Sequence, residues 1–124
     1  QLMFDTILAQ FHAVATQRSH PNDVVRGHLR GEGIKLYIRL GPRFCGSHTF
    51  RALVVADVEV DTAVRRQGFF KLVLHRLERE ALLLDLQAVV VENVITPHLR
   101  DYLLRIGYQP VGHVQDTYYR EIPL

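Results

Sequence analysis

A short loop within residues 60–70 joins a strand-like segment to a helical one and carries the spacing Arg-x-x-Gly. The segment reads Val60-Asp61-Thr62-Ala63-Val64-Arg65-Arg66-Gln67-Gly68-Phe69-Phe70. Backbone N–H groups at such a junction point outward, and the helix dipole adds partial positive charge. Gly68 would let a ligand approach the backbone closely. The loop therefore predicts a site for a phosphate or pyrophosphate; the alternative is an ordinary helix N-terminus with solvated arginines.

Two carboxylates lie near the end of the strand that precedes this loop. Asp57 and Glu59 alternate with Val58 and Val60, so they share one side of the strand. A carboxylate inside a largely apolar strand loses hydration, and this raises its pKa toward the range that a general base near neutral pH requires. Both residues are therefore candidates for a catalytic base. The alternative is that they lie at an exposed strand end and offset nearby arginines.

Hydrophobic periodicity places these residues within a series of helices and strands. We expect helices at 2–17, 69–84 and 96–107, strands at 34–40, 49–60 and 88–91, a loop at 41–47, and a final hairpin of 111–114 with 118–122. Thr96 and Pro97 suit the N-cap and first position of the third helix, and Gly107 its end. The predicted fold is α/β, with a mixed sheet covered by helices on both faces.

Composition limits the classes of protein. The chain of 124 residues is expected to form a single domain spanning 1–124, and 48% apolar content suits a soluble globular fold. The formal charge of +2 does not by itself indicate nucleic-acid binding. The one cysteine, Cys45, cannot form an internal disulfide, which favours a reducing compartment and a cytoplasmic location. No apolar run reaches the roughly 20 residues of a membrane span, and the histidines show no metal-ligand spacing.

The loop and a downstream segment resemble a known family. Residues 60–70 look like motif A of the GNAT family of N-acetyltransferases, Arg/Gln-x-x-Gly-x-Gly/Ala. Val91-Glu92-Asn93, then a helix, then Ile106-Gly107-Tyr108 are similar to motif B of that family. The resemblance covers residues 53–114, and it implies a mostly antiparallel sheet with a central splayed parallel pair.

The resemblance implies acetyl-CoA as cofactor and direct acetyl transfer to an amine. It implies that the pyrophosphate is held by the loop, from Arg65 through Arg66, Gln67, Gly68 and Phe69 to Phe70. The backbone from Val58 to Val60 would pair with the pantetheine arm. Asn93 would bind cofactor amides or hold the strand splay, or else be a turn residue before Thr96. Relatives often carry an acidic residue at the position of Asp57.

The chain departs from the family pattern at two positions. Phe70 replaces the last Gly or Ala of motif A. Leu103 occupies the position, four residues before the closing glycine, where many members place a tyrosine that protonates the leaving thiolate. Tyr102 is one residue earlier, about 100° around the helix, and is either the acid or a packed core residue.

Three hypotheses follow. The first is an acetyl-CoA-dependent N-acetyltransferase, and the second is a catalytically degenerate member of the same fold that acts as a CoA-binding or regulatory module. The third is a nucleic-acid-binding domain that uses Arg26, Arg30, Arg39, Arg43 and Arg51. It is the least favoured, because the charge balance is near neutral and aromatic residues do not interleave with these arginines. The acceptor is expected to be an amine on a small molecule or a protein. We expect no association with a membrane, and the chain is a candidate for a homo-oligomer.

Overall fold

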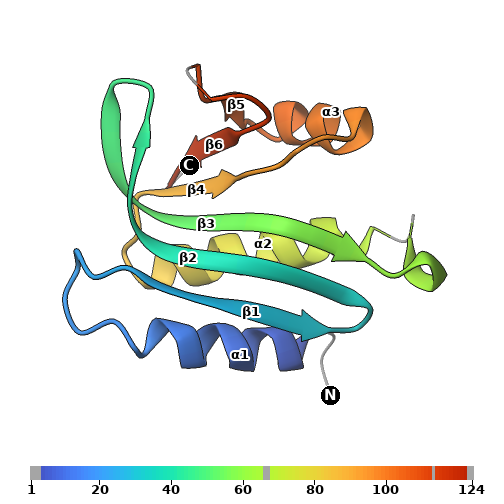
Figure 1. Cartoon of the computed structure of the whole chain (residues 1–124), viewed down its shortest axis with the longest axis horizontal. Coiled ribbons are helices and arrows are strands. Elements are labelled where there is room, and N and C mark those ends of the chain that lie inside the picture. Colours follow the sequence, from blue (N-terminus) through green and yellow to red (C-terminus); the bar gives the residue numbers. More distant parts are fainter. Residues whose placement is uncertain (1–3, 66–67, 113, 123–124) are drawn as a thin grey trace.

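The computed structural model describes residues 4–65, 68–112 and 114–122, which form a six-stranded sheet and three α-helices (Figure 1). In chain order the elements are α1 (Asp5–Ala15), β1 (Val25–Gly31), β2 (Ile34–Cys45), β3 (His48–Val60), a 3-10 turn η1 (Thr62–Val64), α2 (Phe69–Leu83), β4 (Ala88–Val91), α3 (Pro97–Arg105), β5 (Gln109–Pro110) and β6 (Tyr118–Glu121). The strands lie in the order β1-β2-β3-β4-β6-β5. Strands β3 and β4 are parallel, and the other neighbours are antiparallel. The expected mixed sheet with a central parallel pair is thus confirmed.

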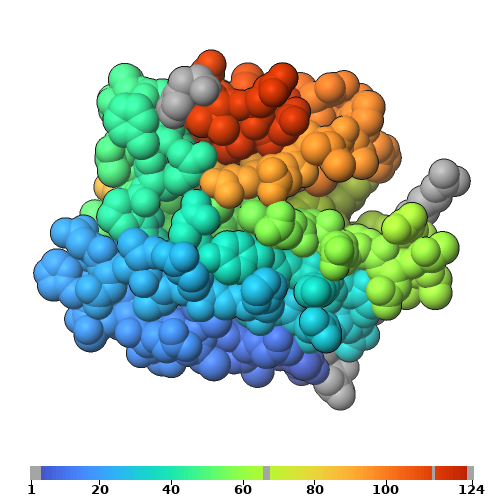
Figure 2. Space-filling model, viewed as in Figure 1, coloured from blue at the N-terminus to red at the C-terminus, as the bar shows by residue number. Residues whose placement is uncertain are grey.

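All three described helices pack on the same face of the sheet. Their buried side chains form one core cluster with inward-facing residues of β1 to β4. Phe4, next to α1, packs edge-on against Phe69 of α2 at 5.7 Å between ring centroids, and the Lys71 ammonium of α2 lies 4.6 Å from the Tyr102 ring centroid of α3. A smaller cluster on the other face contains no residue of a described helix. In Figure 1, α2 lies behind the sheet, and α1 and α3 lie along its lower edge and its upper right; in the same view, Figure 2 shows the strands exposed between them. The expectation of helices on both faces is therefore wrong: the three described helices contact one another in a single layer on one face.

Several elements match the sequence-based expectation closely. Helix α2 and strand β4 lie where their apolar patterns predict them. The Thr96 hydroxyl accepts a hydrogen bond from the Leu99 N–H at 3.4 Å, and Pro97 is the first residue of α3. Strand β3 is third of six in the sheet and fully buried at its centre, as expected from a segment that is apolar on both faces.

Strand β1 is missing from the sequence-based prediction because glycines interrupt its alternation. Its inward positions are Val25, Gly27, Leu29 and Gly31. A Cβ atom at Gly27 would lie 2.6 Å from Cγ2 of Val14 in α1, so glycine at this position lets the helix approach the strand closely. Hydrophobic periodicity cannot register an inward position that has no side chain.

The predicted loop at 41–47 and the predicted strand at 111–114 are both wrong. Strand β2 continues to Cys45, and only Gly46 and Ser47 lie between the paired residues Cys45 and His48. Beyond Leu40, β2 pairs with β3 alone. Pro42 has no N–H to donate, but β1 does not extend to this position, so no hydrogen bond to β1 is lost. The last antiparallel pair joins β6 to Gln109 and Pro110 instead of 111–114.

Candidate functional site

The central parallel strands separate at their C-terminal ends. They pair from Ala52–Ala88 to Val55–Val91, and the Glu92 N–H still donates to the Val55 carbonyl at 2.9 Å. Beyond this point β4 ends, whereas β3 continues to Val60 and pairs with β2 on one side only. Among the described residues, the other edge of β3 has no strand partner there. An extended ligand can add to such an edge by backbone hydrogen bonds, the role expected for the segment from Val58 to Val60.

A β-bulge marks the point of separation. The register of β2 against β3 shifts between Lys35 and Tyr37, so that β3 contributes an extra residue, and Asp57 adopts a left-handed backbone with φ of 51°. Bulges frequently lie beside active sites, where they redirect a side chain and free backbone groups from pairing. Here the bulge turns the chain at the residue expected to act as base.

Asp57 and Asn93 form a bridge across the separated strands. The Asn93 Nδ2 amide donates to Oδ1 of Asp57 at 2.7 Å, and Asn93 also has a left-handed backbone with φ of 61°. The sequence analysis singles out each residue separately, and the structure brings the two together. One carboxylate oxygen of Asp57 is oriented by the amide, which leaves the second oxygen available to a proton donor.

The desolvation expected for the two carboxylates is not present. Asp57 and Glu59 are both exposed, whereas Val58 and Val60 on the other side of the strand pack against the core. Glu59 also lies apart from the bridge, because it faces Lys35 of β2 with 3.8 Å between Oε2 and Nζ. Geometry therefore separates the two candidates: Asp57 is at the splay, and Glu59 pairs toward the neighbouring strand.

The Arg-x-x-Gly loop ends at the uncapped N-terminus of α2. Gly68 is the N-cap residue with φ of 74° and ψ of 15°, and because it is a glycine it offers no side chain of its own to cap the first turn. Among the residues that the structure describes, a Cβ atom at Gly68 would have no neighbour within 4 Å. Arg65 is exposed and its Nε donates to the Val60 carbonyl at 3.0 Å, tying the loop to the end of β3. Arg66 and Gln67 lie outside the described residues.

The two phenylalanines after Gly68 point into the protein. Phe70 is 9% exposed and belongs to the core, and Phe69 is partly buried against the same core. The bulk that replaces the small residue of motif A is therefore directed away from the first-turn amides, which remain available for an anion.

The α3 residues considered as the acid are both packed. Leu103 is 0% exposed, so the usual family position for the acid is filled by a core leucine. Tyr102 is half-buried beneath the Lys71 ammonium, and burial, followed by the charge of Glu78, raises the pKa of its hydroxyl. These contacts are consistent with a packing role for Tyr102 between α2 and α3.

A charged cluster next to the splay went unnoticed in the sequence. Oε2 of Glu92, directly after β4, accepts from Arg39 Nη2 and from Arg43 Nε, each at 3.2 Å. The sequence gives little indication of this cluster, because its contacts join residues about 50 positions apart. The one local sign is that Arg39 lies on the polar side of its predicted strand. Two guanidinium groups hold this carboxylate in place, so Glu92 suits positioning better than proton transfer.

Other candidates are less favoured. Cys45 is fully buried, and burial raises the pKa of its thiol, which makes it a poor nucleophile. His98 is exposed on α3, and His113 lies outside the described residues. Within residues 4–65, 68–112 and 114–122 there is no group of three or more His, Cys, Asp or Glu side chains that could hold a metal ion. Nor is any helix in that part of the chain long and apolar enough to cross a membrane.

Comparison of the sequence with protein-family models and with curated proteins gives no match. Solved structures do match. A mutant of the toxin AtaT bound to acetyl-CoA and to the C-terminus of the antitoxin AtaR has a TM-score of 0.57 at 13% identity, over 94% of this chain and 74% of that chain. A protein of Agrobacterium tumefaciens described as an acetyltransferase has a TM-score of 0.53 at 20% identity, over 93% and 86%. A Desulfovibrio desulfuricans protein assigned to the GNAT family of acetyltransferases has a TM-score of 0.50 at 14% identity, over 92% and 78%.

These likenesses show the fold. The chain has the GNAT fold, and its described strands and helices follow the arrangement of the matching structures. In a second structure of the AtaT mutant the match covers 69% of this chain and only 57% of that chain. No family model matches the two motifs, so motifs A and B stay a resemblance of sequence.

Proposed function

We propose that this chain is an acetyl-CoA-dependent N-acetyltransferase domain. The observation that supports this most directly is the placement of three features at one end of the parallel pair: the free edge of β3, the bulge with the Asp57–Asn93 bridge, and the uncapped N-terminus of α2. An extended thioester with a pyrophosphate at one end needs a strand edge, an anion site and a polar group beside the reacting carbon. The binding of acetyl-CoA to a structural neighbour is consistent with this assignment.

The pyrophosphate would be held by amides of the first turn of α2. Gly68, Phe69 and Phe70 offer backbone N–H groups that have no partner within the helix, at the positive end of the helix dipole. Arg65 adds charge at the end of β3, and Arg66 and Gln67 belong to the same proposed loop. The pantetheine arm would run from this point along Val58 to Val60.

In the proposed reaction, Asp57 acts as the general base. Its bridged carboxylate would accept a proton from the acceptor ammonium, directly or through a water, before the amine attacks the thioester carbonyl. Backbone N–H groups freed by the bulge would polarise that carbonyl. The leaving group is the thiolate of coenzyme A, which is less basic than an alkoxide. It would take its proton from solvent, because Leu103 provides no acid and Tyr102 is packed.

A specific observation favours a second candidate, a GNAT-fold module that binds coenzyme A without transferring the acetyl group. That observation is the burial of Leu103 at the usual acid position, together with the exposure of Asp57. A partner protein for such a module is consistent with the toxin–antitoxin complexes among the structural neighbours.

Release of free thiol separates the two candidates. Purified protein is mixed with acetyl-CoA and a panel of amines that includes polyamines, amino acid amides and lysine peptides, and thiol is measured against an amine-free blank. An enzyme gives amine-dependent thiol release that saturates with acetyl-CoA. Cofactor binding without any amine-dependent release would favour the module instead.

A further inference from the structure

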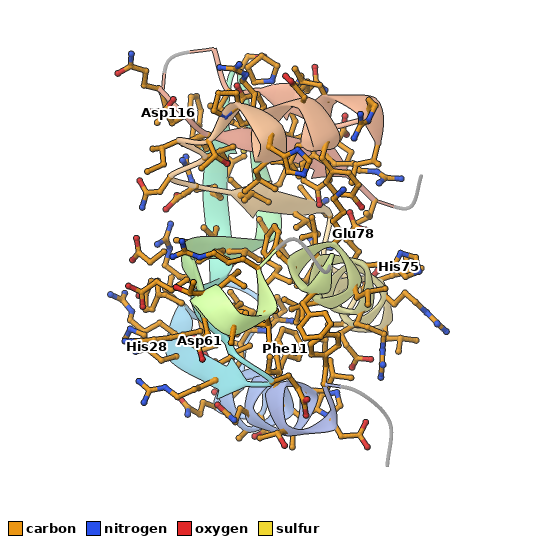
Figure 3. The ribbon with its side chains drawn as sticks, turned by 90° about the vertical axis from the view of Figure 1, so that its right-hand side faces the viewer. Phe11, His28, Asp61, His75, Glu78 and Asp116 are labelled. Atoms are coloured by element: carbon orange, nitrogen blue, oxygen red, sulfur yellow. The ribbon has the colours of Figure 1, made fainter. Side chains whose placement is uncertain are left out.

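The side of the sheet without helices carries three cross-strand pairs on β1 and β2. Arg26 lies opposite Arg39, His28 opposite Tyr37, and Arg30 opposite Lys35. We call these six residues the open face. Their neighbours along each strand point the other way, into the core: Val25, Leu29, Leu36, Ile38 and Leu40 are all buried there. Figure 3 shows His28 on the side of the sheet opposite to His75 and Glu78 of α2.

Two of these pairs place like charges side by side. Like charges directly opposite each other on antiparallel strands destabilise the sheet. Lys35 and Arg39 are offset by Glu59 and Glu92. Among the residues that the structure describes, however, no carboxylate lies within ion-pair distance of Arg26 or Arg30, and both side chains are exposed. The open face therefore presents two exposed guanidinium groups that have no ion-pair partner among the described residues; Arg30 lines a surface pocket together with Lys35, Glu59 and Asp61.

An aromatic pair separates the two cationic pairs. The rings of His28 and Tyr37 lie 5.2 Å apart with an interplanar angle of 50°. Successive outward pairs on a strand are about 7 Å apart, so the cationic pairs lie about 14 Å apart with the rings between them. One of the two sequence-based objections to nucleic-acid binding, beside the near-neutral charge balance, is the lack of aromatic interleaving. It does not hold for this face, because the alternation runs across two strands.

We propose that the open face binds single-stranded nucleic acid. Guanidinium groups match phosphate geometry, and aromatic rings offer a platform on which an unpaired base can stack. A duplex would present phosphates but no free base to the His28–Tyr37 pair. An acidic peptide would use the arginines but not the rings. A second copy of this chain would bring arginines against arginines. This surface goes beyond the proposed acetyl transfer and does not depend on it.

Fluorescence anisotropy with a labelled single strand of about 12 nucleotides, within the usual range of site sizes, tests the proposal. RNA and DNA strands of the same sequence, an RNA duplex and poly-glutamate are compared, with and without acetyl-CoA. Single strands of RNA, DNA or both should bind, in either cofactor condition, at least tenfold more tightly than the duplex or poly-glutamate. Equal binding of duplex or poly-glutamate, or no binding of single strands at low salt, would overturn the proposal.

Two variants and a charge-matched control locate the site. The double variant Arg26→Gln/Arg30→Gln should weaken single-strand binding about tenfold, which is about 1.4 kcal/mol. It should also reduce the slope of log affinity against log salt by about 1.4, because each phosphate contact contributes about 0.7. Tyr37→Leu should weaken binding at least about fivefold through lost stacking. The control Arg79→Gln/Arg105→Gln removes two exposed arginines from α2 and α3 and should bind like wild type; an equal loss in that control would show that net charge alone is responsible.

Discussion

Replacing Gly68 by glutamate tests the anion site at the start of α2. Gly68 has φ of 74°, a conformation that costs a residue with a side chain about 1–2 kcal/mol. A carboxylate at a helix N-terminus returns about 0.3–1 kcal/mol, so the variant should fold with a net loss of stability near 1 kcal/mol. Since the new Cβ would have no neighbour within 4 Å, steric overlap adds nothing to that loss.

The effect on cofactor binding should be much larger than the effect on stability. The glutamate side chain can occupy the first-turn amides and repel the pyrophosphate. Loss of two charge-assisted hydrogen bonds at about 1.5–3 kcal/mol each removes at least about 3 kcal/mol of binding energy. Each 1.4 kcal/mol is a factor of ten, so acetyl-CoA affinity should fall by more than about 100-fold.

Gly46 offers a matched control. It has φ of 62° in the β2–β3 turn, and a Cβ atom there would also have no neighbour within 4 Å. Gly46→Glu therefore carries the same backbone penalty and the same added charge away from the proposed site. Titration calorimetry gives the affinity of both variants, and thermal unfolding gives their stability. If Gly68→Glu binds acetyl-CoA within threefold of Gly46→Glu, the assignment of the loop is wrong.

Three further predictions concern the base, the core and alkaline pH. Asp57→Asn should lower kcat of acetyl transfer by about 10²–10⁴, the usual contribution of a general base, with acetyl-CoA affinity unchanged; Glu59→Gln should leave kcat within threefold, and the reverse pattern would exchange the two roles. Gly27→Ala places a methyl group against α1 and should cost about 1–3 kcal/mol in urea unfolding, whereas Gly112→Ala, which meets nothing within 4 Å, should be neutral. Burial raises the pKa of the Tyr108 hydroxyl. The folding stability linked to this shift is present below the unfolded-state pKa of about 10 and is lost as pH rises above it. The urea midpoint should therefore fall above about pH 10, and Tyr108→Phe, compared at matched pH, should show a smaller fall.

The sequence predicts those parts of the fold whose side chains carry a complete pattern. Strand β4 is an unbroken apolar run, and α2 has an apolar stripe at helical spacing, so both lie where expected. Strand β1 is not predicted from the sequence, because Gly27 and Gly31 occupy inward positions where α1 approaches and so interrupt the apolar alternation. The extension of β2 past Gly41 and Pro42 escapes because turn-forming residues are tolerated where a strand has only one partner.

The candidate site is predictable only where the local sequence determines it. The Arg-x-x-Gly loop and Asn93 can be located from the sequence because each lies within a few residues of the end of a predicted strand. The exposure of Asp57 is not readable, since the bulge that turns it outward depends on its register against β2. The contact of Glu92 with Arg39 and Arg43 joins distant segments and leaves no periodic signal. The charged and aromatic pairs of the open face leave no linear signal either, because their alternation runs across two strands.

Titration calorimetry of the unmodified protein with acetyl-CoA and with coenzyme A tests the central claim most directly. The uncapped α2 terminus and the free β3 edge predict that both ligands bind in the micromolar range, with coenzyme A retaining most of the affinity because the pyrophosphate and pantetheine contacts are common to both. Desulfo-coenzyme A should bind similarly, whereas pantetheine alone should bind far more weakly. Absence of heat from either ligand at concentrations near millimolar would contradict the assignment of a coenzyme A site to this fold.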